Sequence, residues 1–171
     1  MDRISLSKIK KDWHFPALEI EAKYDGAAIC PTTFNNPLLM YQYFLGQWNI
    51  GLIDIQEQIM VMFLNNGLKV IGHRLIGTGD AKSARIYTKL IAGIAINCMA
   101  ERVIVAHNHP SGALSPSNGD KRVCMHLGQT LEIFDVVLQD FLIISRDGFW
   151  SLRDETFSPE SKKAIWNTYS I

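Results

Sequence analysis

Two histidines and an aspartate near the middle of the chain have the residue types and spacing of metal ligands. His107 and His109 follow a short apolar run, Val103 to Ala106, which is typical of a buried strand. Side chains two residues apart in an extended chain project from the same face, so the two imidazoles lie together. Asp120 comes after a loop and opens a helical pattern. Three N/O ligands leave one tetrahedral position for water, which is the arrangement of a catalytic rather than a structural zinc site.

The spacing Ser117-x-x-Asp120 has a simpler meaning when it is taken alone. Serine is a favoured helix N-cap, and an acid in the first turn is stabilised by the helix dipole. A histidine pair at a strand end is likewise often without a functional role, because polar residues commonly occur where a strand leaves the core. The co-occurrence of His107-x-His109-Pro110 with Ser117-x-x-Asp120 favours a Zn²⁺ site. The two interpretations are compatible, because Ser117 can cap the helix while Asp120 binds metal.

These residues resemble the signature of the JAMM (JAB/MPN) metalloproteases, His-x-His-Pro followed by Ser-x-x-Asp. The longer run from His107 to Gly112, together with Pro116 and Ser117-x-x-Asp120, is similar to the RadC branch of that family. The resemblance extends from about Trp48 to about Asp154. It implies a Zn²⁺-dependent peptidase or isopeptidase that uses a metal-activated water, with a peptide or an isopeptide-linked protein as its substrate.

A metal-activated water needs a general base that takes its proton and passes it to the leaving group. Glu101 is rejected because it precedes the histidine strand, whose length puts it roughly 20 Å from the ligands. In the resembled family the catalytic glutamate lies upstream of the histidine pair, at the start of a strand. Glu57, just before the apolar run Ile59 to Leu64, matches that position, with Asp54 as its competitor. The resemblance also implies that Ser117 helps to hold the developing oxyanion of the substrate carbonyl.

The surrounding patterns predict an α/β domain with a mixed central sheet flanked by helices. Asn65-Asn66-Gly67 predicts a hairpin turn between two strands. The helix around Lys89 carries no later charge and is expected to be largely buried. The family resemblance implies the same architecture, a cytidine-deaminase-like JAB/MPN fold. The predicted strands are 17–24, 59–64, 69–76, 103–106, 134–144 and 149–152, and the predicted helices are 38–48, 83–99 and 117–133.

A chain of 171 residues is long enough for one domain with an extension. Residues 46–155 are expected to form the RadC-like JAB/MPN domain. Residues 1–45 are expected to be an N-terminal extension of a strand and a helix that packs on this core, and residues 156–171 a C-terminal tail.

The composition is ordinary for a soluble globular protein, with 47% hydrophobic and 20% charged residues. The 17 basic and 17 acidic residues cancel, which leaves no electrostatic footprint for nucleic acid or an anionic membrane. Cys30, Cys98 and Cys124 are odd in number and far apart, and they indicate reduced thiols in a cytoplasmic protein. No apolar run is long enough for a transmembrane span. His14, His73 and His126 are expected to be surface or hydrogen-bonded histidines.

The sequence departs from the RadC pattern at one place. Relatives usually carry Asp-His in the strand after the motif helix, whereas Asp140 is followed here by Phe141. The change leaves the metal ligands intact and puts only a neighbouring contact in doubt. Residues 1–45 do not resemble the N-terminal helix-hairpin-helix domain of many RadC proteins. A RadC-type DNA-repair accessory protein is therefore the alternative function. The sequence lacks the Pro-Cys-x-x-Cys helix that a nucleobase deaminase needs, which disfavours that function. The complete ligand set disfavours a metal-free scaffold.

Overall fold

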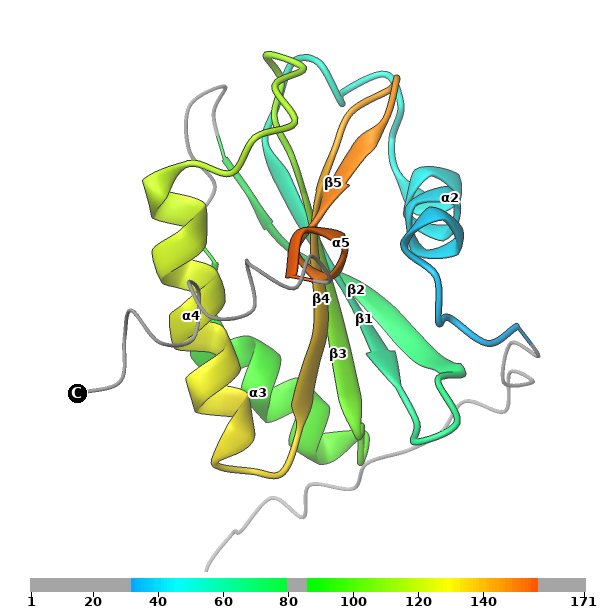
Figure 1. Cartoon of the computed structure of the whole chain (residues 1–171), viewed down its shortest axis with the longest axis vertical. Helices are drawn as coiled ribbons and strands as arrows, with labels where there is room; N and C mark the ends of the chain where they lie inside the picture. The colour runs from blue at the N-terminus through cyan, green and yellow to red at the C-terminus, as the bar shows by residue number, and fades with distance from the viewer. Residues whose placement is uncertain (1–31, 80–85, 157–171) are drawn as a thin grey trace, which may run out of the picture.

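The computed structural model describes residues 32–79 and 86–156, which form a five-stranded mixed sheet flanked by helices, as predicted (Figure 1). The strand order is β2-β1-β3-β4-β5, and among these pairs only β3 and β4 run parallel. None of the helices in the described ranges combines the length and hydrophobicity that a bilayer crossing requires. The strands are β1 (Gln58–Leu64), β2 (Val70–Thr78), β3 (Arg102–Asn108), β4 (Val137–Ile144) and β5 (Phe149–Ser151), and the helices are α2 (Pro37–Gln47), α3 (Thr88–Asn97), α4 (Asn118–Glu132) and α5 (Leu152–Thr156).

The central strands are buried on both faces because helices cover both sides of the sheet. In Figure 1, α3 and α4 lie on one side and α2 on the other. Every residue of β1 is buried, which explains its continuous apolar run. Alternate side chains enter two separate cores. Ile59, Val61, Phe63, Val103 and Val105 belong to the core on the α3 and α4 side, whereas Met60, Met62, Leu64, Ile104 and Ala106 belong to the core on the α2 side.

The connection from β3 through α4 to β4 creates the edge at which the predicted ligands meet. The strands β3 and β4 are parallel, so α4 must return along the sheet between them. The carboxyl end of β3 and the N-terminus of α4 therefore lie at the same end of the molecule (Figure 1). This is the end of an α/β sheet where side chains from successive elements can converge.

Several predicted boundaries move, each for a local reason. The strand predicted from Phe134 begins at Val137, because residues 133–135 form a turn after α4, in which Asp135 has φ 58°. The polar pair Gln139-Asp140 does not interrupt β4. The register with β3 skips Gln139, so this residue is a bulge in an otherwise continuous strand.

The prediction that α3 is largely buried is wrong. Only Ile91, Ala92 and Ala95 are buried on this helix, because a single stripe faces the sheet. Leu90 and Ile96 are exposed. Absence of charge therefore did not indicate burial in this segment. The predicted strand 17–24, the start of the predicted helix 83–99, and residues 157–171 lie outside the described residues.

A buried carboxylate joins β4 to the two elements that follow it. Asp140 is 1% exposed. It accepts hydrogen bonds from the backbone N–H of Phe141 at 2.8 Å, from the Ser151 hydroxyl at 2.8 Å and from the Arg153 N–H at 3.1 Å. Burial raises the pKa of Asp140 to about 6, although these hydrogen bonds act in the opposite direction. The carboxyl group therefore takes up a proton near pH 6 in the folded protein.

This raised pKa predicts a fall in stability with rising pH. An unfolded chain loses the Asp140 proton near pH 4, whereas the folded chain keeps it to about pH 6. The folded state binds more protons between those values, so the free energy of unfolding should fall by about 1–3 kcal/mol from pH 4 to pH 7 through this group. Asp140→Asn should remove that fall. Urea unfolding of both proteins at the two pH values measures it, and equal pH slopes would contradict it.

Candidate metal centre

The structure brings His107, His109 and Asp120 together at the edge formed by β3 and α4. These three side chains, called here the ligand cluster, offer donor atoms that all lie within 4.8 Å of one another. His107 is in β3 and His109 follows its last residue, while Asp120 is in the first turn of α4. The spacing of the two histidines and the cap position of Asp120 were read from the sequence, and the β3–α4 connection supplies their convergence.

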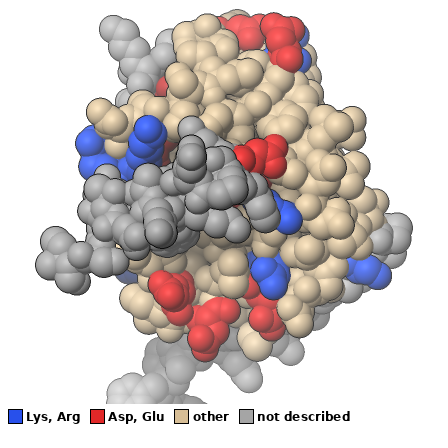
Figure 2. Space-filling model, viewed as in Figure 1, with Lys and Arg blue, Asp and Glu red and all other residues tan. Residues whose placement is uncertain are grey.

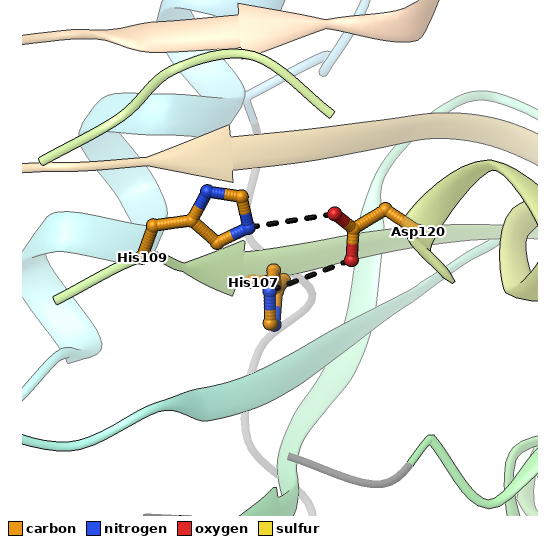
Figure 3. Close-up of side chains that lie close together, drawn as sticks. All are labelled: His107, His109 and Asp120. Atoms are coloured by element: carbon orange, nitrogen blue, oxygen red, sulfur yellow. Dashed lines mark ion pairs between the residues drawn. The ribbon is translucent and has the colours of Figure 1, made fainter. Parts of the chain in front are cut away.

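Asp120 lies between the two imidazoles, with one carboxylate oxygen toward each. His107 Nε2 is 3.6 Å from Asp120 Oδ1, and His109 Nε2 is 3.5 Å from Asp120 Oδ2 (Figure 3). The two rings meet edge to face, with centroids 4.8 Å apart and planes at 85°. Two nitrogens and a carboxylate therefore face a common point from β3 and α4.

The loop after β3 orients the ring of His109. Its Nδ1 lies 2.9 Å from the carbonyl oxygen of Ala113, and only a protonated Nδ1 can donate to that oxygen. The remaining nitrogen, Nε2, is then the one that faces Asp120. Gly112 allows the tight return of the loop, because its φ of 76° lies in the left-handed region that favours glycine. A histidine ring fixed by a backbone carbonyl in this way is typical of metal ligands.

The ring of His107 is deeply buried and neutral at physiological pH. Burial lowers the pKa of His107 to about 4, and the attraction of Asp120 only partly offsets that effect. Its Nδ1 is buried and has no hydrogen-bond partner among the described residues. Because a metal ion binds the neutral form of imidazole, the ring is already in the protonation state that coordination requires.

Asp120 stays ionised and also caps its own helix. Its burial would raise the pKa, but hydrogen bonds with His109 and Ser117 outweigh burial and hold the pKa below its usual range. The carboxylate accepts the Ser117 N–H at 2.7 Å, and the Ser117 hydroxyl accepts the Asp120 N–H at 3.1 Å. This capping box confirms the helix start that the sequence predicted.

The donor set fits a zinc ion. Zinc-to-ligand bonds of about 2.0–2.1 Å in a tetrahedron separate neighbouring ligand atoms by roughly 3.3–3.4 Å. The two nitrogen–oxygen separations in the ligand cluster are close to that value. Cys124 lies one helical turn beyond Asp120, but burial raises the pKa of its thiol to about 12, so it stays protonated and is a poor ligand. Two imidazoles and one carboxylate therefore remain the candidate ligands.

Glu57 is close enough to His109 for its charge to act on that ring, whereas its competitor Asp54 has no such effect. Glu57 precedes β1 and is buried, at 8% exposed. The pKa of His109 is raised first by its hydrogen bond to Asp120, and the negative charge of Glu57 contributes to the same rise. Asp54 is half exposed and pairs with Arg146. Glu57 is therefore the nearby carboxylate that could exchange protons at this edge.

His73, His126 and Phe141 are placed away from this chemistry, whereas His14 lies outside the described residues. His73 is exposed and shares a hydrogen bond of 2.8 Å with the hydroxyl of Tyr43, and His126 is exposed on α4. Phe141 is 1% exposed and belongs to the core beneath α3 and α4. Phe141 therefore serves packing in this chain. Where the Asp-His pattern has a polar imidazole, this chain has an apolar ring in the core.

Sequence patterns did not identify the residues that hold the loops around the ligand cluster. Arg146 in the β4–β5 turn pairs with Asp54, and its Nη2 donates to the Ile50 carbonyl at 2.7 Å. Asn108 makes three hydrogen bonds to residues 53–58, at and just before the start of β1. The only available signal for Asn108 was its position between the two histidines, which says nothing about which loop it would reach.

Comparison with known proteins gives one family. The family described as "RadC-like JAB domain" matches residues 34–157, which include α2, the whole sheet and the ligand cluster. This match covers more than half of the chain.

Individual relatives agree with this family. A UPF0758 protein from Thermotoga maritima is 38% identical over 100 residues, which is 58% of this chain and 45% of the relative. One from Chlorobaculum parvum is 34% identical over 103 residues, covering 60% of this chain and 46% of the relative. One from Streptococcus suis is 30% identical over 126 residues, covering 70% and 51%. The chain thus spans about half the length of these curated relatives.

Proposed function

Because the chain belongs to the family of RadC-like JAB domains, we propose that it is a Zn²⁺-dependent hydrolase of peptide or isopeptide bonds. The observation that carries the proposal is the convergence of two histidines and an aspartate on one point, with the buried carboxylate of Glu57 beside them. His107, His109 and Asp120 would hold the ion. Three protein ligands leave the open position that catalytic zinc sites have.

Zinc held there would lower the pKa of a coordinated water and polarise a substrate carbonyl. Glu57 would supply the proton transfers: a carboxylate oxygen accepts a proton from the attacking water and then donates it to the departing amine. Its low exposure limits competition from bulk water. Throughout the reaction His109 keeps its Nδ1 proton, which is hydrogen-bonded to the Ala113 carbonyl oxygen. The orientation of the His109 ring therefore does not change when Glu57 transfers a proton.

In this proposal Ser117 would contribute a hydrogen bond at the same edge. Its oxygen accepts the Asp120 N–H, and its hydroxyl also hydrogen-bonds the Asp120 carboxylate, so the O–H would turn from that carboxylate to the substrate oxygen. The side chain is exposed, as a group that meets substrate must be. We assign it the stabilisation of negative charge that develops on the carbonyl oxygen during attack.

Replacing this serine should separate its two roles. Ser117→Ala should lower the free energy of unfolding by about 1 kcal/mol through the lost cap. It should also reduce turnover by roughly tenfold or more through the lost donor. Ser117→Asp keeps a cap acceptor without a donor, so it should restore stability and not turnover. Thermal melts and initial rates measure the two effects, and full activity of Ser117→Ala would contradict the oxyanion role.

The alternative of a DNA-repair accessory protein has less support. The formal net charge of the chain is zero. On the face drawn in Figure 2, lysine and arginine side chains lie in small scattered groups among uncharged surface, rather than in one basic stripe. Non-specific DNA binding depends on such a stripe and weakens steeply with salt. A salt-sensitive affinity for duplex DNA would favour the alternative.

The hydrolase is tested with the full chain and a mixed peptide library that includes lysine-linked isopeptides. Elemental analysis should find about one equivalent of Zn²⁺ after loading. Cleavage should stop on chelation and return when Zn²⁺ is added back. A protein that binds Zn²⁺ at the ligand cluster and cleaves no peptide or isopeptide bond would contradict the proposal.

A further inference from the structure

The side chain between the two histidines holds the segment that carries Glu57. Asn108 is fully buried, at 0% exposed. Its Oδ1 accepts the Gln58 N–H at 2.6 Å, and its Nδ2 donates to the carbonyl oxygens of Ile53 at 2.6 Å and Gln56 at 2.9 Å. A backbone N–H can only donate and a carbonyl can only accept, so these partners fix the orientation of the amide. One side chain therefore binds the residues immediately before and after Glu57.

The alternation of β3 explains how neighbouring residues serve two faces of the sheet. His107 pairs in register with Ile59, which belongs to the core beneath α3 and α4. Asn108, the next residue, points to the opposite face, where Ile53 packs in the core beneath α2. Glu57 lies two residues before Ile59 and returns to the face of His107. The segment is thus fixed from one face while its carboxylate serves the other.

We propose that Asn108 is a positioning residue that sets the carboxylate of Glu57 against the ligand cluster. The inference rests on the proposed function, because it assigns Glu57 the proton transfer. Asn108 provides no ligand and acts only through the backbone on either side of Glu57. The Glu57 carbonyl is itself held by the Gly79 N–H at 2.8 Å. A catalytic group displaced by about 1 Å can lose about a hundredfold in rate, so this anchoring has a measurable consequence.

Two replacements and one control separate positioning from general stabilisation. Asn108→Ser is too short to keep all three hydrogen bonds. Asn108→Asp keeps the shape and the acceptor for Gln58 but replaces the donor with an oxygen that faces two carbonyls. Ser151→Ala is the matched control, because Ser151 is also buried, at 3% exposed, and its hydrogen bond with Asp140 lies in a different network.

The first measurement does not depend on turnover. Amide hydrogen exchange at Gln58 should speed up by roughly tenfold or more in Asn108→Ser, since its acceptor is lost. Backbone resonances of residues 53–58 should broaden or double. Affinity for Co²⁺, followed by its visible absorption, should stay within about threefold, because every ligand remains. Asn108→Asp keeps the acceptor for the Gln58 N–H but loses the donor to Ile53 and Gln56, so exchange at Gln58 should change less while the resonances of residues 53–56 still broaden or double. The Ser151→Ala control should leave all these signals unchanged.

The second measurement uses a peptide cleaved by the wild-type protein. Asn108→Ser should lower kcat by roughly ten- to a hundredfold, with a smaller change in KM. Asn108 acts through Glu57, so the loss should nearly vanish when both proteins also carry Glu57→Gln. If Asn108 and Glu57 contributed independently, the fold-losses in kcat from the two substitutions would multiply instead.

Three results would overturn the positioning role: unchanged exchange at Gln58 in Asn108→Ser, a fall in Co²⁺ affinity that matches the fall in kcat, or an undiminished kcat loss in the Glu57→Gln background. Failure of the proposed function looks different, because the wild-type protein would then bind Zn²⁺ and cleave nothing. The exchange measurement at Gln58 would still decide whether Asn108 fixes the Glu57 segment.

Discussion

Glu57→Gln should reduce hydrolysis to a small residual rate while the protein keeps its metal. The amide has nearly the shape of the carboxylate but cannot accept a proton, so turnover should fall by roughly a hundredfold or more. The ligand cluster is untouched by this change, so Zn²⁺ content should remain the same. Initial rates on a cleaved peptide, with Zn²⁺ measured in the same samples, give the result.

Two matched variants sharpen this prediction. Glu101→Gln makes the same chemical change at an exposed site at the start of β3, at the end of the strand opposite the histidines, and should leave turnover unchanged. Asp54→Asn removes the competing acid, which pairs with Arg146, and should lower turnover far less than Glu57→Gln. If Asp54→Asn were the inactive variant, the assignment of the general base would be wrong.

The local placement of the three residues in the ligand cluster could be predicted from the sequence, whereas their convergence needed the β3–α4 connection. His107 and His109 are fixed by strand alternation, and Asp120 by the capping box that begins α4. Long apolar runs likewise predicted the central strands, because a strand that is buried on both faces is apolar throughout instead of alternating between apolar and polar residues. These features depend on contacts within a few residues, which a single sequence contains.

The parts that the sequence did not predict depend on residues that are distant along the chain. Asn108 reaches a loop about fifty positions earlier, and no local pattern indicates such a pairing. The bulge at Gln139 exists only in register with β3. The hairpin after β1 gives a local example, because the positive φ falls on Leu68, at 59°, and not on the adjacent glycine that signalled the turn. Tertiary contacts decided the first two details, and local turn geometry decided the third.

Asp120→Ala should remove metal binding and hydrolysis and leave a folded protein. The ligand cluster lies at the edge of the sheet, outside the two apolar cores. Burying a large aliphatic side chain contributes about 1.5–3 kcal/mol, and the cores contain many such residues with no exposed surface. The variant should lose about 1–2 kcal/mol of unfolding free energy, because the capping box and the favourable charge at the start of α4 are lost. Its thermal transition should stay cooperative.

Asp120→Asn separates the metal from the cap. An asparagine oxygen can still accept the Ser117 N–H, so most of the lost stability should return, whereas a neutral amide is a weak zinc ligand and hydrolysis should not. Chelating the wild-type protein should likewise lower its free energy of unfolding only by the free energy of zinc binding, and its melting temperature should fall accordingly. A chelated protein that loses its near-ultraviolet circular dichroism and melts without cooperativity would show that the ion is structural. The core beneath α3 and α4 would then depend on the ligand cluster, and the assignment of an open catalytic site would fail with it.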